Sequence, residues 1–299
     1  MKIEKCRICP RACGALRTER AGVGWCGMGA LPAVARAALH FGEEPCISGK
    51  RGSGAIFFSG CSLRCVFCQN SPISQERRGQ YISIETLGGL FANLQAQGAH
   101  NINLVNPTHF VPAIRAALLA HPPGIPVVYN TSGYETPATL HSLEGLVDVY
   151  LPDLKYVDAE DARRFSGAAD YPAYACEALQ LMYAQTGPAQ YDAEGMLLRG
   201  TLVRHLVLPG MTVGSMHVLN WLHEHLPDVP ISLMGQYTPC AKACQIKGLD
   251  RPLKLREYQR VAAHLSAIGI EAGYLQPPDA AGCEAIPIWD GTGLPDDLK

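Results

Sequence analysis

An α/β fold is predicted for this chain: a partial, TIM-type (β/α)6 barrel of parallel strands, preceded by a small cysteine-rich subdomain. From about residue 54, short apolar runs rich in β-branched residues alternate with longer helical patterns, which is typical of repeated βα units. Polar side chains follow one predicted strand after another, and barrels of parallel strands form their sites where the strands end. Cysteines are concentrated before this region and in its first loop.

The predicted elements follow one another in regular order. The predicted strands are residues 55–58, 102–105, 126–129, 147–151, 202–208, 231–234 and, more weakly patterned, 270–275. The predicted helices between them are residues 83–97, 110–120, 137–143, 172–185, 213–225 and 254–268. Short apolar runs do not differ from buried helix in periodicity alone, so the regular alternation decides the assignment.

Three regions are expected along the chain. Residues 1–50 form a cysteine-rich subdomain with one predicted helix, residues 31–40; residues 51–275 form the barrel; residues 276–299 form an irregular, proline-containing tail. So short an N-terminal segment buries little apolar surface of its own, and a bound metal is a natural substitute for a core.

The composition narrows the class of protein. The chain has 299 residues, 47% of them hydrophobic and 17% charged, as in a globular protein. A net charge of −2 and a pI near 6.5 give no sequence-wide attraction to nucleic acid or acidic membranes. The first residues lack the apolar segment of a signal peptide, and no run reaches the roughly 18–20 apolar residues of a membrane span. We expect a cytoplasmic protein with neither nucleic acid nor membrane as a partner.

Seven of the twelve cysteines fall into two tight groups, Cys61, Cys65, Cys68 and Cys6, Cys9, Cys13, Cys26, while Cys46, Cys176 and Cys283 are isolated. A cytosolic chain with clustered cysteines favours metal binding over disulfides. Three thiolates on one loop hold three irons of a [4Fe–4S] cluster and leave the fourth iron open. The alternatives for this loop are a three-cysteine zinc site or reduced core thiols. The N-terminal group suits zinc or an iron–sulfur cluster equally, or consists of unliganded thiols.

Polar side chains stand at the ends of the second to sixth predicted strands and, with the cysteine loop after the first, indicate one shared site. They are Asn106 to His109, Asn130 to Tyr134, Asp153 and Lys155, Arg204 and His205, and Gln236 to Thr238. His109 is either a substrate contact or proton donor, or a histidine of a helix start. Arg204 and His205 alternate across their strand, so one of the two faces the barrel interior; we expect Arg204 to do so.

The C-x3-C-x2-C loop with Phe67 before its last cysteine resembles the cluster loop of the radical S-adenosylmethionine (SAM) superfamily. The stretches 129–134, 150–155 and 203–210, with the Cys-Pro-Arg-x-Cys start and Asn-Pro-Thr-His, resemble pyruvate formate-lyase activating enzymes, above all their PflX-type relatives. Roughly residues 1–275 are covered. One departure is that residues 105–109 replace the Gly-Gly-Glu-type segment of the activating enzymes.

The resemblance implies a role for each matching residue. The cluster ligands are Cys61, Cys65 and Cys68, and SAM binds the open iron through its amine and carboxylate. Phe67 lies close to adenine. In place of the missing segment, the amide oxygen of Asn106 or the hydroxyl of Thr108 is the expected acceptor from the SAM amine. The remaining implied contacts are Asn130, Ser132 and Gly133 near the ribose, Asp153 and Lys155 at the methionyl and ribose groups, and Arg204 near the SAM carboxylate.

The implied activity is reductive cleavage of SAM to a 5′-deoxyadenosyl radical that takes a hydrogen atom from the substrate. The implied partners are an electron donor such as flavodoxin or ferredoxin and a protein substrate with a glycine loop. One alternative is modification or epimerisation of a small molecule, with a cysteine such as Cys240 as hydrogen donor. Cys240 and Cys244 are either free thiols, which we favour, or hydrogen donors or ligands of an auxiliary cluster. An alternative of another class is an iron–sulfur or zinc protein for electron transfer or scaffolding.

Overall fold

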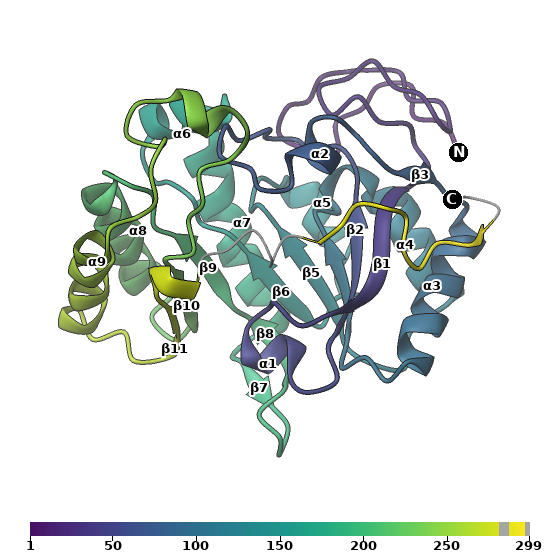
Figure 1. Ribbon diagram of the computed structural model, residues 1–299. Coiled ribbons are helices and arrows are strands. Elements are labelled where there is room, and N and C mark those ends of the chain that lie inside the picture. The colour runs from purple at the N-terminus through teal and green to yellow at the C-terminus, as the bar shows by residue number, and fades with distance from the viewer. Residues whose placement is uncertain (281–286, 297–299) are drawn as a thin grey trace.

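The computed structural model describes residues 1–280 and 287–296. Its centre is a series of parallel strands, shown in Figure 1: β2 (Ser53–Phe58), β4 (Ile102–Val105), β5 (Val127–Thr131) and β6 (Val149–Pro152) pair in this order. Next to β6 come β8 (Leu197–Thr201) and, after one residue, β9 (Val203–Leu206). Then follow β10 (Ile231–Met234) and β11 (Gly273–Gln276), also parallel. The predicted strands are confirmed to within a few residues, and the fold is mixed α/β with a largely parallel sheet, consistent with a partial barrel.

The predicted helix over residues 31–40 is wrong, because these residues form strand β1 (Ala33–His40). The alanine-rich run has helical propensity, but it pairs antiparallel with β2 from Val34 to His40, and tertiary pairing overrides propensity. A two-residue strand, β3 (Gln80–Tyr81), pairs with the start of β1. The barrel sheet therefore receives a strand from within the first 50 residues.

Helices pack on the outer face of the sheet. The predicted ones are confirmed as α3 (Ile84–Ala96), α4 (Val111–Ala120), α5 (Pro137–His141), α7 (Tyr171–Thr186), α8 (Thr212–His225) and α9 (Leu255–Ala267). Another helix, α6 (Ala159–Ser166), was not predicted; Asp158 caps it by accepting from the amides of Glu160 and Asp161. Ile56, Phe58 and Leu104 bury their side chains under α3 and α4, so this face is the apolar core.

The inner face of the sheet is covered by the β1–β2 connection. Its short helix α1 (Pro45–Ser48) buries Cys46 and Ile47 against Val128, Val149, Leu151 and Leu202, at the lower end of the sheet in Figure 1. Just before it, Glu43 and Glu44 also face inward, since their carboxylates bond side chains of the inner strands. The base of the barrel is thus filled by this connection.

The two ends of the chain lie over the sheet. Residues 1–32 form turns joined by isolated bridges, and they lie above the strand ends near α2 (Ser71–Ser74) in Figure 1. Of the predicted tail, residues 281–286, with Cys283, and 297–299 lie outside the described residues. The described part runs beside β1, where Ala37 N donates to Thr292 O at 2.9 Å and Trp289 packs on Phe57.

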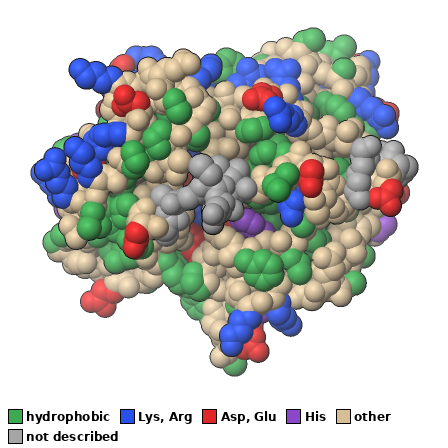
Figure 2. Space-filling view, viewed as in Figure 1, with side chains coloured by type: hydrophobic (Ala, Val, Ile, Leu, Met, Phe, Trp, Pro, Cys, Tyr) green, Lys and Arg blue, Asp and Glu red, His purple; other side chains and the backbone are tan. Residues whose placement is uncertain are grey.

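The surface and the helix lengths agree with the composition. Basic side chains are interspersed with acidic and hydrophobic ones across the face shown in Figure 2. In residues 1–280 and 287–296, every helix is too short or too polar for the hydrocarbon layer of a bilayer.

Candidate functional site

The three-cysteine loop connects β2 to α2 and presents its sulfur atoms beside hydrogen-bond donors. Cys65 Sγ lies 3.0 Å from Ser166 Oγ, and Cys68 Sγ lies 3.3 Å from Ser74 Oγ. Cys61 Sγ accepts from the amide of Leu63 at 3.3 Å. Donors at each sulfur stabilise a thiolate, so the site fits the three-cysteine end of an iron–sulfur cluster.

The thiols do not converge on a single point. Within the described part of the chain, no three His, Cys, Asp or Glu side chains are grouped tightly enough to hold one metal ion. A mononuclear zinc site at Cys61, Cys65 and Cys68 therefore has no support. In a cubane each cysteine binds its own iron, so its thiols stay apart. Burial raises the pKa of Cys65 to about 12, so the metal must supply the positive charge that keeps this sulfur ionised.

Asp153 and Lys155 follow β6 and form a short ion pair, with Lys155 Nζ donating to Asp153 Oδ2 at 2.5 Å. Burial disfavours the charge of Lys155, but the carboxylate of Asp153 and the nearby thiol of Cys65 outweigh it and raise the pKa of Lys155. The pair lines a small cavity together with Phe67 of the cysteine loop and Tyr156, Leu206 and Leu208. The structure thus brings Phe67, Asp153 and Lys155 together at one cavity.

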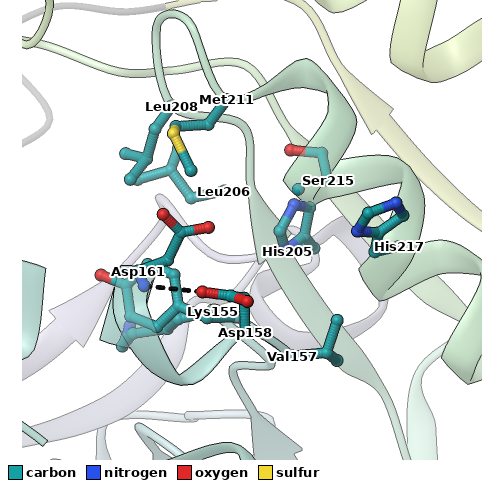
Figure 3. A pocket seen from close by; sticks show the side chains of 12 residues that line it. Lys155, Val157, Asp158, Asp161, His205, Leu206, Leu208, Met211, Ser215 and His217 are labelled. Atoms are coloured by element: carbon teal, nitrogen blue, oxygen red, sulfur yellow. Dashed lines mark hydrogen bonds between the residues drawn. The ribbon is translucent and has the colours of Figure 1, made fainter. Parts of the chain in front are cut away.

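A second cavity adjoins the first, because both are lined by Lys155, Tyr156, Leu206 and Leu208. Figure 3 shows Asp158 and Asp161 on one side of it and His205, Ser215 and His217 on the other. His205 is buried and points away from the barrel interior, with Nδ1 donating to Leu154 O at 2.7 Å. Burial lowers the pKa of His205 to about 4, so its imidazole is neutral near pH 7.

The ends of β5 and β6 are joined by a tyrosine that the sequence analysis missed. The Tyr171 hydroxyl, at the start of α7, donates to Ser132 O and to Asp153 O, both at 2.9 Å, and accepts from Lys155 N at 3.0 Å. Two segments with predicted SAM contacts, at Ser132 and at Asp153 to Lys155, therefore depend on one buried hydroxyl. In the sequence, the position of Tyr171 before Pro172 indicates the start of a helix, but it does not indicate these hydrogen bonds.

Ser132 and Gly133 stand where β5 approaches β6. A Cβ at residue 133 would lie 2.6 Å from Asp153 O, and φ there is +77°, so this position requires glycine. Ser132 Oγ is buried and has no hydrogen-bond partner in the protein. A buried hydroxyl without a partner costs free energy, and a polar ligand such as a ribose would satisfy it.

Arg204 faces the barrel interior, as predicted, but its partners differ from the SAM carboxylate implied by the resemblance. Its guanidinium donates to both Glu43 and Glu44, with Nε 2.9 Å from Glu44 Oε1. Burial opposes the charge of Glu44, but Arg204 outweighs it and lowers the pKa of Glu44. Asn130 also donates to Glu43, at 3.3 Å. Arg204 and Asn130 thus belong to a network below the strand ends, and the sequence analysis missed its two glutamates.

Asn106 supports the cysteine loop from the end of β4. Its Nδ2 donates to Gly60 O at 2.5 Å, and its φ of +59° turns the chain sharply. His109 acts in the same way, with Nε2 donating to Ser59 O at 2.7 Å. Burial lowers the pKa of His109 to about 3, so its imidazole is neutral and does not serve as an acid near neutral pH. Both residues hold the loop in place.

The remaining predicted cysteines lie near the loop. Cys240 Sγ donates to Phe67 O at 3.4 Å, whereas Cys244 is exposed. The N-terminal segment that carries Cys6, Cys9, Cys13 and Cys26 is tied to the loop by Arg11, whose Nε donates to Ser62 O at 2.9 Å. The two cysteine groups, 35 residues apart in sequence at their closest members Cys26 and Cys61, are therefore neighbours in space.

Fold and site together define the class: an α/β protein whose first parallel strand leads into a three-thiol loop beside a small cavity that Asp153 and Lys155 line. A family model described as the radical SAM superfamily matches residues 55–222, more than half of the chain. The chain belongs to the radical SAM superfamily. Its cofactors are accordingly a [4Fe–4S] cluster and SAM.

Similar proteins include one relative in sequence and solved structures with a similar fold. A relative from Methanocaldococcus jannaschii, Uncharacterized protein MJ0674, is 28% identical over 236 residues, which are 74% of this chain and 63% of the relative. The chain thus spans less than two thirds of that relative's length. Two structures of Streptococcus suis SuiB, one bound to the precursor peptide SuiA, have TM-scores of 0.50 at 9% and 10% identity. They cover 73% and 75% of this chain and 46% and 47% of SuiB. Such low identity shows the fold alone.

Proposed function

We propose that this chain takes a hydrogen atom from a carbon of its substrate, in the manner of the activating enzymes of glycyl-radical enzymes. The observation that carries the proposal is the three-cysteine loop with Asp153 and Lys155 beside it, since Phe67 of the loop shares their cavity. The bound cluster and SAM supply the 5′-deoxyadenosyl radical after one electron arrives from a donor such as flavodoxin or ferredoxin. The protein binds, orients and shields.

The side chains around the cavity divide these tasks. Cys61, Cys65 and Cys68 hold the cluster. Lys155 stays protonated because Asp153 raises its pKa, so it donates hydrogen bonds to the acceptor atoms of SAM while Asp153 accepts from hydroxyl or ammonium groups. The surrounding apolar side chains exclude water from the radical.

The binding role of Lys155 is tested by comparing the SAM affinity of Lys155→Met with that of a control variant, Lys247→Met, which removes an exposed lysine. A charge-assisted hydrogen bond contributes about 1.5–3 kcal/mol, so the SAM dissociation constant should rise about 10- to 100-fold for Lys155→Met. Lys247→Met should bind as wild type does. Equal affinity of both variants, measured by equilibrium dialysis on reconstituted protein, would contradict the role.

The radical chemistry is tested on protein reconstituted without oxygen and reduced with dithionite. Wild type should convert SAM to 5′-deoxyadenosine and methionine, and Cys65→Ala should not, because one cluster ligand is lost. The same near-zero yield from both proteins would refute the proposed reaction.

A peptide segment is the substrate class we favour. A solved neighbour with the same fold, SuiB, is described in complex with a precursor peptide, so this fold accommodates a peptide. The test is deuterium transfer into 5′-deoxyadenosine from candidate proteins labelled at glycine Cα. Transfer from a labelled small molecule, with none from labelled glycine, would overturn the peptide assignment.

One observation favours a second candidate, modification of a small molecule with a cysteine as hydrogen donor. Cys240 lies against the cysteine loop, with its Sγ 3.4 Å from Phe67 O. If this thiol returns a hydrogen atom to the substrate radical, Cys240→Ala should still cleave SAM but should accumulate substrate-derived radical. Cys244→Ala, which removes an exposed thiol, is the control. The same product from wild type and Cys240→Ala would exclude the donor role.

A further inference from the structure

The backbone of the N-terminal segment brings its four cysteines to one place. Cys6 pairs with the chain eight to nine residues later, as its amide donates to Ala15 O and its carbonyl accepts from Gly14 N, both at 3.0 Å. The chain then returns at Gly24, where a Cβ would lie 2.9 Å from Cys13 Sγ. Cys26 is close enough to Cys6 and Cys13 to interact with them electrostatically, and Cys9 is close enough to Cys6 and Cys26 to do the same. The four thiols form one group, here called the N-terminal thiol group.

A buried cation faces this group. Arg17 is 1% exposed, and its guanidinium donates to Met28 O at 3.0 Å, His109 O at 2.7 Å and Cys6 Sγ at 3.6 Å. Among the ion pairs of the described residues, none joins Arg17 to a carboxylate. A buried charge without a counter-charge costs several kcal/mol. Anionic sulfur at Cys6 is the counter-charge that its surroundings offer, and thiolates in a buried place require a metal.

How closely the thiols are grouped bears on whether the site holds one metal ion or an iron–sulfur cluster. Neither the N-terminal thiol group nor the Cys61, Cys65 and Cys68 loop has the convergent grouping of a single-ion site. The loop belongs to a superfamily that binds a [4Fe–4S] cluster, and the N-terminal thiol group, like the loop, lacks the tight grouping of a site for one ion. Four cysteines occupy all four irons of a cubane, whereas three leave one iron open.

We propose that Cys6, Cys9, Cys13 and Cys26 bind a second [4Fe–4S] cluster, with buried Arg17 as its counter-charge. Because all its irons carry cysteine, this cluster has no place for SAM. The chemistry left to it is the transfer of single electrons: it is reduced by one electron from a flavodoxin- or ferredoxin-class donor and reoxidised when that electron passes to the SAM-binding cluster.

The contacts between the two cysteine groups suit such a transfer. The Trp25 ring, next to Cys26 in the chain, lies 4.1 Å from the Arg11 guanidinium and 5.2 Å from that of Arg64. Arg64 lies between Cys61 and Cys65 in sequence, and its side chain donates to Trp25 O. One layer of side chains thus separates the two groups. Cys13 is exposed, so the N-terminal thiol group reaches the surface where a donor docks.

The experiment counts metal in reconstituted protein and does not depend on radical activity, so it stays decisive whether or not SAM is cleaved. Wild type should hold about eight irons and about eight sulfides per chain, twice the content of one cluster. The quadruple Cys→Ser variant of the N-terminal thiol group should hold about four, with an electron paramagnetic resonance signal that SAM perturbs. The Cys61, Cys65 and Cys68 triple Cys→Ser variant should also hold about four, with a signal that SAM leaves unchanged.

The control is Cys176→Ser, which removes an isolated, half-buried thiol on α7 and should retain all iron. If a variant fails to fold, the iron content of the wild-type protein alone decides between one cluster and two. About four irons in wild type, alone or with one zinc, would overturn the second cluster. A triple variant without iron would overturn it equally.

Discussion

The buried carboxyl of Glu135 gives a prediction whose size follows from the structure. Glu135 is fully buried behind the strand ends, and its Oε1 accepts from Thr108 and Thr131, both at 2.5 Å, and from Tyr129 at 3.2 Å. Its Oε2 has no partner. Burial raises the pKa of Glu135 from 4.5 to about 7, against the opposing effect of the three hydroxyl groups.

The sign of the pH dependence follows from that shift. The folded chain favours the neutral carboxyl, so the contribution of Glu135 to stability is complete below pH 4.5 and is lost as the pH rises to about 7. At about 1.4 kcal/mol per pH unit, the loss is about 3 kcal/mol. Glu135→Gln keeps the three accepted hydrogen bonds and cannot ionise, so it should abolish this loss.

The assay is urea unfolding of both proteins under anaerobic conditions from pH 5 to pH 8. The free energy of unfolding of Glu135→Gln should rise relative to wild type by about 2–3 kcal/mol over this range. Glu144→Gln, an exposed control, should stay within about 0.5 kcal/mol of wild type at every pH. A difference between Glu135→Gln and wild type that is the same at all pH values would refute the reasoning.

Three further substitutions are expected to lower the free energy of unfolding, and each is measured by chemical unfolding. Arg204→Met leaves two buried glutamates unpaired and should lower the free energy of unfolding by about 3–5 kcal/mol; a loss below 1 kcal/mol would show that the glutamates are not charged. Tyr171→Phe leaves a buried amide and two carbonyls unpaired and should cost about 1–3 kcal/mol together with weaker SAM binding; unchanged values of both would contradict its joining role. Gly133→Ala should cost at least about 1 kcal/mol more than Gly145→Ala, because φ is positive at both but only the first meets a carbonyl; equal costs would exclude the close approach.

The parallel strands and their polar ends could be predicted because local patterns encode them. The run at β4 and the pair Asp153 and Lys155 lie in short segments whose burial and strand-end position follow from the regular alternation of strand and helix patterns. The order of strands then brings the pair to the cysteine loop without further information, because parallel strands end at one rim.

What the sequence did not predict depends on contacts between distant segments. The alanine-rich β1 is a strand only because β2 is available for pairing, and Tyr171 reaches the site from the start of a helix. Arg204 was assigned its direction by alternation, but its partners come from residues 160 positions earlier in the chain. Periodicity describes which face a side chain occupies and not which group meets it there.

The hydrogen bonds between the N-terminal segment and later parts of the chain have a consequence for the order in which the protein folds on the ribosome. Arg17 needs the carbonyl of His109, Ile8 O accepts from Thr139 at 2.5 Å, and Arg11 needs Ser166 O at 3.1 Å. More than half of the chain must therefore be synthesised before the contacts around the N-terminal cysteines are complete. Contacts so distant in sequence form late in folding. Until then these thiols are exposed to oxidation, and insertion of the proposed second cluster must follow translation of the barrel strands that cover them.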